Sequence, residues 1–384
     1  IIEAATNSGI NTYTVDSGSY TINKNAITAA ELNELDNKYN GYVDASAVIT
    51  ITGTAAEINT AYTSSGIKGL GNEAVIITGN LVNADIATLN SISNQTSGVI
   101  TAALANVTVA QANNLTTSGT DSITITLLAG SAAASDLNSL DRKTNIAIQA
   151  KAITEIRGSI FEVEQARRSA GITLDTDYQV FISGTIGNAD IPKINELAAE
   201  TSGVITAALA NVTAAQADTL TTNGSDAITI TLSSGAVIAP QLLSIDNKTS
   251  VAVNANSITQ INGTVAAIKA IYGSNGIAGL GNEAVTITDT TLSSSDLAVL
   301  DVNTTGVINA ASVTTLIGTA AETLTAYHGH AAATISGLGD EAVTISDFSI
   351  DAGSLNNLDN YTSGIINAAS ITNLTGTDAD KAKA

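Results

Sequence analysis

Apolar residues recur along the chain in short segments with two different periods. In "AVTIT" from Ala284, the valine and isoleucine fall on one side of an extended chain and the threonines fall on the other. A period of two with β-branched residues is typical of a strand with one buried face. Between such segments leucines recur at helical spacing, as at Leu297 and Leu300. The pattern therefore predicts short strands that alternate with short helices.

The predicted helices share a start signal, the capping box T-x-x-[EQ]. It occurs at Thr28/Glu31, Thr54/Glu57, Thr108/Gln111, Thr213/Gln216 and Thr319/Glu322. In this motif the Thr hydroxyl and the Glu or Gln side chain bind backbone N–H groups that the first helical turn leaves without partners. The only prolines, Pro192 and Pro240, fall where a helix would begin, and that position tolerates proline.

The chain is internally repetitive on two scales. "GVITAALANVT" begins at Gly98 and again at Gly203, an offset of 105 residues. Strand-like segments recur mostly every 21 to 25 residues, with four longer steps of 32 to 36. They start near Tyr20, Gly41, Ala74, Gly98, Ser122, Ile146, Tyr178, Gly203, Ala227, Val251, Ala284, Gly306, Ala342 and Gly364. The periodicity predicts about fourteen coils of one structural unit.

The expected fold is α/β, a β/α solenoid with a parallel sheet on one side and a row of short helices on the other. Helices of two or three turns are unstable alone, so the coils must stack to bury their aliphatic faces. Residues 1–384 are predicted to form a single continuous repeat solenoid. A parallel β-helix with few helices is the alternative.

One motif has the spacing of a dinucleotide-binding fingerprint. "GLGNEA" from Gly279 reads G-x-G-x-x-A and recurs at Gly69 and, with Asp for Asn, at Gly337. A dinucleotide site requires a strand before this motif and a helix after it. Here the motif follows a loop and leads into a strand. We therefore interpret its glycines as turn residues with positive φ.

Composition narrows the possible functions. The chain is 44% apolar, 13% charged and 3% aromatic, and it contains no Cys, Met or Trp. These values predict an aliphatic core and exclude disulfides and thiolate metal sites. A net charge of -21 and a pI near 4.1 argue against binding of nucleic acid. No window approaches the 18 or so unbroken apolar residues of a membrane helix, so no membrane span is predicted.

The outward strand face is the first candidate surface. Its predicted polar ladder consists of Thr124, Thr126, Thr229, Thr231, Asn254, Thr286, Thr288, Asn309 and Asn367. Such a face could contact glycans or a protein partner, or it could be the solvated side of the sheet. Regular threonine ladders can also match ice, but the Asn and Gln positions interrupt this one.

A divergent coil is the second candidate surface. "EIRGSIFEVEQARRSAG" from Glu155 concentrates Arg157, Arg167 and Arg168 near Phe161. These four residues predict self-association through a lateral contact with another acidic copy. An ordinary charged helix face is the alternative.

No cofactor is expected, with calcium as a weaker alternative. Turns such as "LDVNTTG" from Leu300 offer oxygen ligands that calcium prefers, but neither an EF-hand loop nor the calcium-binding nonapeptide repeat is present. His328 and His330 lack a nearby third ligand, and no nucleophile with a recognisable base stands out.

The two ends of the sequence are complementary. Thr377 and Asp380 begin another capping-box helix, and "IIEAATNSGI" at residues 1–10 resembles the second half of such an element. The solenoid is therefore predicted to be uncapped at both ends, as a segment of a longer array or as the subunit of a head-to-tail filament.

The repeat phrasing carries a family resemblance. "GTAAE…AY…GI.GLGNEAVTITDTTL…LDVNTTGVINAASVTTL" resembles the tandem repeats of very large secreted, adhesin-like cell-surface proteins of marine cyanobacteria, most clearly over residues 260–376. The resemblance implies an extracellular or cell-surface location. We therefore expect a non-catalytic structural protein that forms a layer, fibre or filament. The alternative is an adhesin or fibre-shaft module that binds glycans or a protein partner. A polysaccharide-degrading enzyme would need a charged cleft, which the few Lys and Arg residues disfavour.

Overall fold

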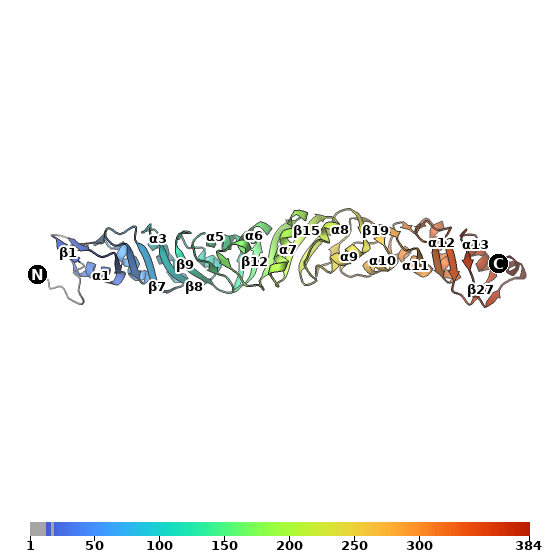
Figure 1. Ribbon diagram of the computed structural model, residues 1–384, viewed down its shortest axis with the longest axis horizontal. Helices are drawn as coiled ribbons and strands as arrows, with labels where there is room; N and C mark the ends of the chain where they lie inside the picture. The colour runs from blue at the N-terminus through green and yellow to red at the C-terminus, as the bar shows by residue number, and fades with distance from the viewer. Residues whose placement is uncertain (1–12, 17–18) are drawn as a thin grey trace. The chain divides into compact units, whose positions relative to one another are not determined.

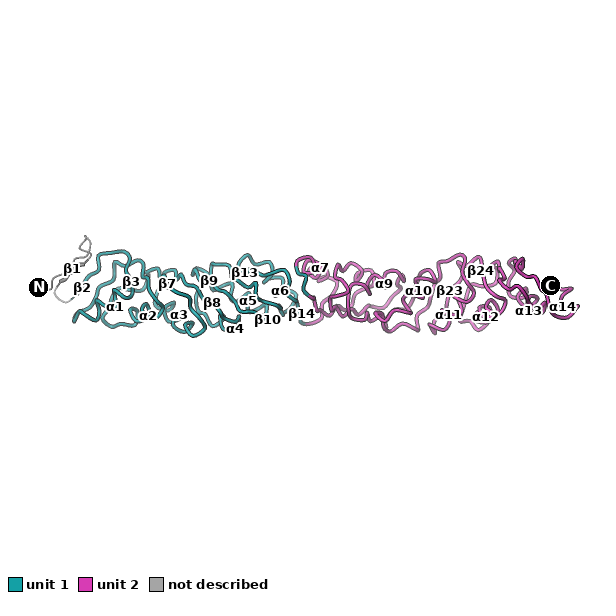
Figure 2. Tube along the Cα trace, turned by 90° about the horizontal axis from the view of Figure 1, so that it is seen from below, with its two compact units in different colours: residues 1–183, 201–203 teal, residues 184–200, 204–384 magenta. Residues whose placement is uncertain are grey.

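The computed structural model of the chain describes residues 13–16 and 19–384. Short strands and α-helices alternate along the chain (Figure 1). They form two compact units. Unit 1 comprises residues 1–183 and 201–203, and unit 2 comprises residues 184–200 and 204–384 (Figure 2).

Unit 1 contains one large parallel sheet and two smaller groups of strands. The large sheet has the order β13 (Ile172–Thr173), β11 (Ile148–Gln149), β9 (Ser122–Leu127), β8 (Ile100–Val107), β7 (Ala74–Leu81), β5 (Thr50–Gly53) and β3 (Ala26–Thr28). The first smaller group consists of β2 (Ser19–Ile22), β4 (Tyr42–Asp44) and β6 (Ile67–Lys68), and β1 (Tyr13–Asp16) pairs antiparallel to β2. The second consists of β10 (Gly130–Ala133), β12 (Ile153–Gly158) and the first part of β14 (Gln179–Ile186). The helices are α1 (Ala29–Lys38), α2 (Ala55–Thr63), α3 (Ile86–Ser93), α4 (Val109–Ala112), α5 (Ala134–Asp141) and α6 (Ile160–Arg168), with the 3₁₀ turn η1 (Asn83–Asp85) before α3.

Unit 2 repeats this plan with parallel pairs throughout. Its strand groups are β15 (Ile205–Val212), β16 (Ala227–Leu232), β18 (Val253–Asn254) and β20 (Ile277–Ala278); β17 (Gly235–Ile238), β19 (Ile258–Gly263), β21 (Ala284–Ile287), β23 (Ile308–Asn309) and β25 (Ile335–Ser336); β22 (Thr291–Ser293), β24 (Thr315–Gly318), β26 (Ala342–Ile345) and β28 (Ile366–Asn367); and β27 (Ser349–Asp351) with β29 (Asn373–Thr375). The helices are α7 (Ile191–Glu200), α8 (Ala214–Ala217), α9 (Ala239–Asp246), α10 (Val265–Tyr272), α11 (Ser294–Asn303), α12 (Ala320–Ala331), α13 (Ala352–Asp359) and α14 (Asp378–Lys383), with η2 (Asn188–Asp190) before α7.

The predicted α/β class and the parallel strand pairing are confirmed. Fourteen α-helices among the described residues favour a β/α arrangement over the helix-poor alternative. The prediction of a single sheet is wrong, because the strands belong to several sheets. Most coils contain two short strands separated by a turn, where the sequence pattern had indicated one.

The turns that divide the strands are held by Asp and Asn side chains. After β4, the Asp44 carboxylate accepts a hydrogen bond from the Ser46 amide (3.0 Å). Asn254, Asn309 and Asn367 each accept in the same way from the amide two residues later, at 3.1, 3.0 and 3.1 Å. Such Asx-turns end one strand and redirect the chain into the next. Three asparagines of the predicted ladder therefore have a structural role.

The capping boxes form at the helix starts. Thr54, Thr108, Thr213 and Thr319 each make both reciprocal hydrogen bonds. Thr28 caps α1 in part, because the Glu31 carboxylate pairs with Lys24 instead of the cap backbone. Ser159 and Glu162 form a further complete box on α6 that the threonine pattern missed. Both prolines lie in the first turn of a helix, as predicted.

The core is aliphatic, and the phenylalanines lie outside it. Ile, Leu and Val side chains from strands and helices make up most of the buried surface in both units. Phe161, Phe181 and Phe348 are 70%, 38% and 73% exposed, and the sequence contains no other phenylalanine. Because exposed phenyl rings add nothing to the core, these positions are candidates for contact with a partner.

Candidate functional site

The predicted polar ladder lies on outward positions of the strands. None of its members is buried: Thr124 and Thr126 lie on β9, Thr229 and Thr231 on β16, Asn254 on β18, Thr286 on β21, Thr288 directly after β21, Asn309 on β23 and Asn367 on β28. The strand register places Thr231 beside Asn254 and Thr286 beside Asn309. Because these strands belong to four different sheets, the ladder forms short polar rows instead of one continuous face.

The basic residues of the divergent coil do not form one cluster. On α6, Arg167 and Arg168 both pair with Glu164, at 2.7 and 2.9 Å. The Arg167 side chain is only 6% exposed, so it lies inside an ion pair and not on the surface that self-association requires. Phe161, on the same helix, is exposed.

Arg157 lies apart from these residues, on the outward face of β12. Its guanidinium binds the Glu155 carboxylate through Nε and through Nη2, the latter at 2.9 Å. The same guanidinium lies over the Phe181 ring, 4.9 Å from the ring centroid. Sequence spacing does not predict this contact, because Phe181 lies 24 residues further along the chain.

The fingerprint-like turn encloses a buried carboxylate. Glu73 is 1% exposed, and its Oε2 accepts hydrogen bonds from the amides of Gly71 (2.8 Å) and Asn72 (3.2 Å). The Tyr62 hydroxyl donates to Oε1. Burial raises the pKa of Tyr62, and its contact with the Glu73 carboxylate raises it further. The N–H groups that would hold a phosphate in a dinucleotide site therefore bind the glutamate of the same turn.

The same arrangement recurs at the other two copies of the motif. Glu283 accepts from the Gly281 and Asn282 amides and from the Tyr272 hydroxyl. Glu341 has the matching partners Gly339, Asp340 and Tyr327. The turn glycines have positive φ, such as +85° at Gly69, as the sequence predicted. The role of the glutamate was missed, because its tyrosine partner is close only in the folded chain.

A second motif, T-[ST]-G, fastens each of these turns to the following coil. The Thr96 hydroxyl donates to the Glu73 carbonyl (2.7 Å), and the Ser97 amide donates to the Gly71 carbonyl (2.9 Å). A Cβ added at Gly98 would lie 2.2 Å from the Glu73 carbonyl oxygen, so only glycine fits there. The hydroxyls of Thr304 and Thr362 make the same contact with the Glu283 and Glu341 carbonyls.

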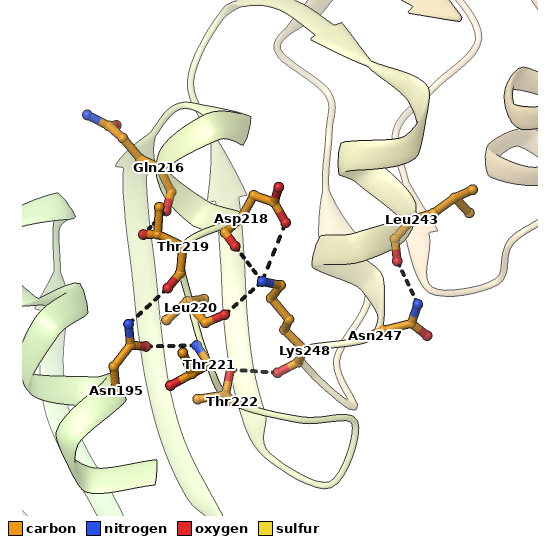
Figure 3. A network of polar contacts seen from close by, with 10 residues as sticks. All are labelled: Asn195, Gln216, Asp218, Thr219, Leu220, Thr221, Thr222, Leu243, Asn247 and Lys248. Atoms are coloured by element: carbon orange, nitrogen blue, oxygen red, sulfur yellow. Dashed lines mark hydrogen bonds and ion pairs between the residues drawn. The ribbon is translucent and has the colours of Figure 1, made fainter. Parts of the chain in front are cut away.

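Lys248 joins two coils in the same manner. Its ammonium donates to the Leu220 carbonyl (2.7 Å) and the Asp218 carbonyl, and lies 3.4 Å from the Asp218 carboxylate (Figure 3). The Thr222 hydroxyl donates back to the Lys248 carbonyl (2.8 Å). Lys143 makes equivalent contacts one repeat earlier, and burial lowers its pKa. Both lysines are therefore structural bridges between coils.

Helix asparagines supply a further contact between coils. Asn195 donates to the Thr219 carbonyl (2.9 Å) and accepts from the Thr221 amide (2.8 Å) (Figure 3). Asn90 makes the same pair of bonds with Asn114 and Thr116. Each side chain supplies partners to the non-helical backbone that follows the short helix of the next coil, α4 or α8.

The residues considered for metal binding have other contacts. Within residues 13–16 and 19–384, no three His, Asp or Glu side chains are grouped to hold a metal ion. Asp121, in the "TSGTD" turn, accepts from the Ser118 amide (2.8 Å) and the Ile100 amide (2.9 Å). His330 lies 3.1 Å from the Ile335 carbonyl. Calcium binding stays an untested prediction. No described helix has the length and apolarity needed to cross a membrane.

Comparison with known proteins does not add a function. No protein-family model matches the chain, and a search of curated proteins finds no match. The interpretation therefore depends on the contacts themselves. These contacts direct buried glutamates, half-buried lysines, and threonine and asparagine side chains at the backbone of their own turn or of a neighbouring coil.

Proposed function

We propose that the chain is a non-catalytic structural protein whose coils stack into a β/α solenoid of about fourteen coils. One observation carries the proposal. A helix asparagine binds the backbone of the next coil at the same separation of 24 residues in five places, at Asn33, Asn90, Asn138, Asn195 and Asn356. A contact repeated at constant spacing makes each coil the support of the next, as in other repeat architectures.

The solenoid would build an extracellular layer, fibre or filament by end-to-end stacking. In the described residues, β28 and β29 each pair with only one neighbour, so each offers a strand edge. A further coil, from a longer chain or from a second copy, would pair with those edges by the same hydrogen bonds. The extracellular location rests on the resemblance of the repeats to secreted cell-surface arrays.

Electron microscopy of the purified chain and of the native surface material tests this function. Filaments or sheets of uniform width, with a length that grows with protein concentration, are the expected result. Particles that stay single at all concentrations would contradict end-to-end stacking. Turnover of any polysaccharide by the purified chain would contradict the non-catalytic role.

An adhesin or fibre-shaft module is the second candidate. The outward threonine pairs on β9 and β16 favour it, because hydroxyl groups two residues apart on one strand can bind sugar hydroxyls or a protein backbone. A glycan array probed with the purified chain tests this candidate. Specific binding that is lost in a Thr229→Val, Thr231→Val double variant would support it.

A further inference from the structure

Charge is distributed unevenly along this acidic chain. Residues 142–168 contain six of the fourteen Lys and Arg residues and only three acidic residues. Residues 270–380 contain twelve Asp and Glu residues and no Lys or Arg. A short basic segment therefore interrupts a chain whose net charge is -21, and a long segment of the same chain carries only negative charge.

Within the basic segment, Arg157 is held in a defined position on the sheet surface. It pairs in register with Ala133 on one side and Phe181 on the other. Glu155 holds the guanidinium edge, and the Phe181 ring supports its flat face at 4.9 Å. The Arg157 side chain is still 53% exposed, since the small Ala133 side chain leaves that flank open. A guanidinium fixed in this way can bind a carboxylate with little further loss of side-chain entropy.

The fold does not require this arrangement. One repeat earlier, the positions of Arg157 and Phe181 are occupied by Thr52 and Ile76, and one repeat later by Asn262 and Thr286. The framework around them is kept, since Gly158 packs against the helix that follows β10 just as its counterparts Gly53 and Gly263 pack against theirs. A charged and aromatic pair introduced onto an unchanged framework points to selection for an external contact.

We propose that Arg157, supported by Glu155 and Phe181, is a lateral docking site for the acidic 270–380 segment of a second copy of this chain. Charge complementarity carries the choice of partner, because the chain itself supplies carboxylates in large excess. A stacked sugar ring fits less well, since the guanidinium already lies over one face of the phenyl ring. The contact goes beyond end-to-end stacking and does not depend on it.

Carbodiimide cross-linking of the Arg157→Lys variant tests the partner directly. The reagent joins the new amine to any carboxylate in contact with it, and a mixture of light and heavy isotope-labelled chains distinguishes links between copies. We expect links between copies from position 157 to carboxylates in residues 270–380. Links to Glu155 of the same copy alone would overturn the proposal. The Arg142→Lys variant is the control and should give no such links.

Sedimentation equilibrium of the chain measures the strength of the contact. We expect Arg157→Gln to weaken lateral association by about tenfold, as loss of a close charge pair does at other interfaces. Arg142→Gln changes the net charge equally and should leave association unchanged. Equal effects of the two substitutions, or association that occurs only when an acidic polysaccharide is added, would overturn the proposal. Electron microscopy measures the length of end-to-end filaments separately from lateral association, and Arg157→Gln should not shorten these filaments.

Discussion

At the scale of single residues, the three buried glutamates act as internal anions for their own turns. Replacing Glu283 with Ala removes the carboxylate oxygen that accepts from both the Gly281 and the Asn282 amide. Leaving a buried amide without a partner costs about 1–3 kcal/mol. We therefore expect faster hydrogen exchange at both amides and a lower midpoint of urea unfolding. The exposed Glu34→Ala variant, which loses only a surface pair with Lys38, should behave as the wild type does.

Gly98 gives a steric prediction at the same scale. A methyl group at this position would lie 2.2 Å from the Glu73 carbonyl, against backbone that is held by the Thr96 hydroxyl. Overpacking of this kind costs roughly 1–3 kcal/mol, so Gly98→Ala should lower the thermal unfolding midpoint. Gly187→Ala is a matched control, because nothing lies within 4 Å of the added methyl group. Similar losses of stability in both variants would contradict the close-approach explanation.

Residue roles were predictable where they depend on neighbours in sequence. Thr54 and Glu57 are three residues apart, so their capping box could be predicted from spacing alone. The burial of Glu73 could not, because its partner Tyr62 approaches only after α2 has turned the chain back. Likewise the role of the T-[ST]-G motif could not be predicted, because the carbonyl that Thr96 binds belongs to Glu73, 23 residues earlier in the chain.

At the scale of elements, the capping boxes make helix stability depend on pH. Backbone and side-chain hydrogen bonds from Thr54, Ser159 and Thr319 hold the pKa values of Glu57, Glu162 and Glu322 below the ordinary value of 4.5. The folded state therefore binds these protons less readily than the unfolded state. The stabilisation is present above the ordinary pKa and is lost as pH falls through the lower, folded value.

A triple Glu→Gln variant at positions 57, 162 and 322 tests this dependence. Glutamine does not titrate, but it keeps the cap hydrogen bonds, as Gln111 and Gln216 do in the natural boxes of α4 and α8. Between about pH 5 and pH 3, we expect the unfolding midpoint of the variant to fall less steeply than that of the wild type. If the unfolding midpoints of the variant and the wild type fall equally steeply with pH, carboxylates other than Glu57, Glu162 and Glu322 dominate acid unfolding.

Element boundaries show where sequence patterns are insufficient. Alternating β-branched residues predict the strands, but the pattern does not separate the two strands that most coils contain. The dividing signal is an Asp or Asn side chain, such as Asp44, that bonds the amide two residues later. In a chain rich in Asn, Asp and Thr, that signal is not distinct from ordinary outward polar positions. The three ladder asparagines lie outward as predicted, but the turn contacts of their side chains were missed for the same reason.

At the scale of the whole molecule, repetition made the fold class predictable. An offset of 105 residues between near-identical segments implies equal local structures, and stacking follows from the instability of short elements alone. The Arg157–Phe181 pair could not be derived in this way, because it departs from the repeat. Exceptions to a repeat are therefore where contact with a partner is best sought.

The repeat also predicts which deletions the fold tolerates. Removing residues 99–203 deletes one complete 105-residue repeat and joins Gly98 to Val204, which restores the native sequence "TSGVITAALANVT" across the junction. If stability comes mainly from contacts between neighbouring coils, each coil keeps its partners. We expect the shortened chain to show the circular dichroism per residue and unfolding midpoint of the full chain.

A deletion that is not a whole number of repeats tests whether the chain depends on contacts between neighbouring coils or simply tolerates the loss of any segment. Removing residues 99–191 takes out a similar length but joins Gly98, at the start of a strand, to Pro192, in the first turn of α7. The strand that should pair with β7 is then missing, and the Thr96 and Gly98 contacts lead into a helix instead. We expect loss of cooperative unfolding and early proteolysis near the junction. If both deletions fold equally well, neighbouring coils do not depend on each other and the solenoid proposal is wrong.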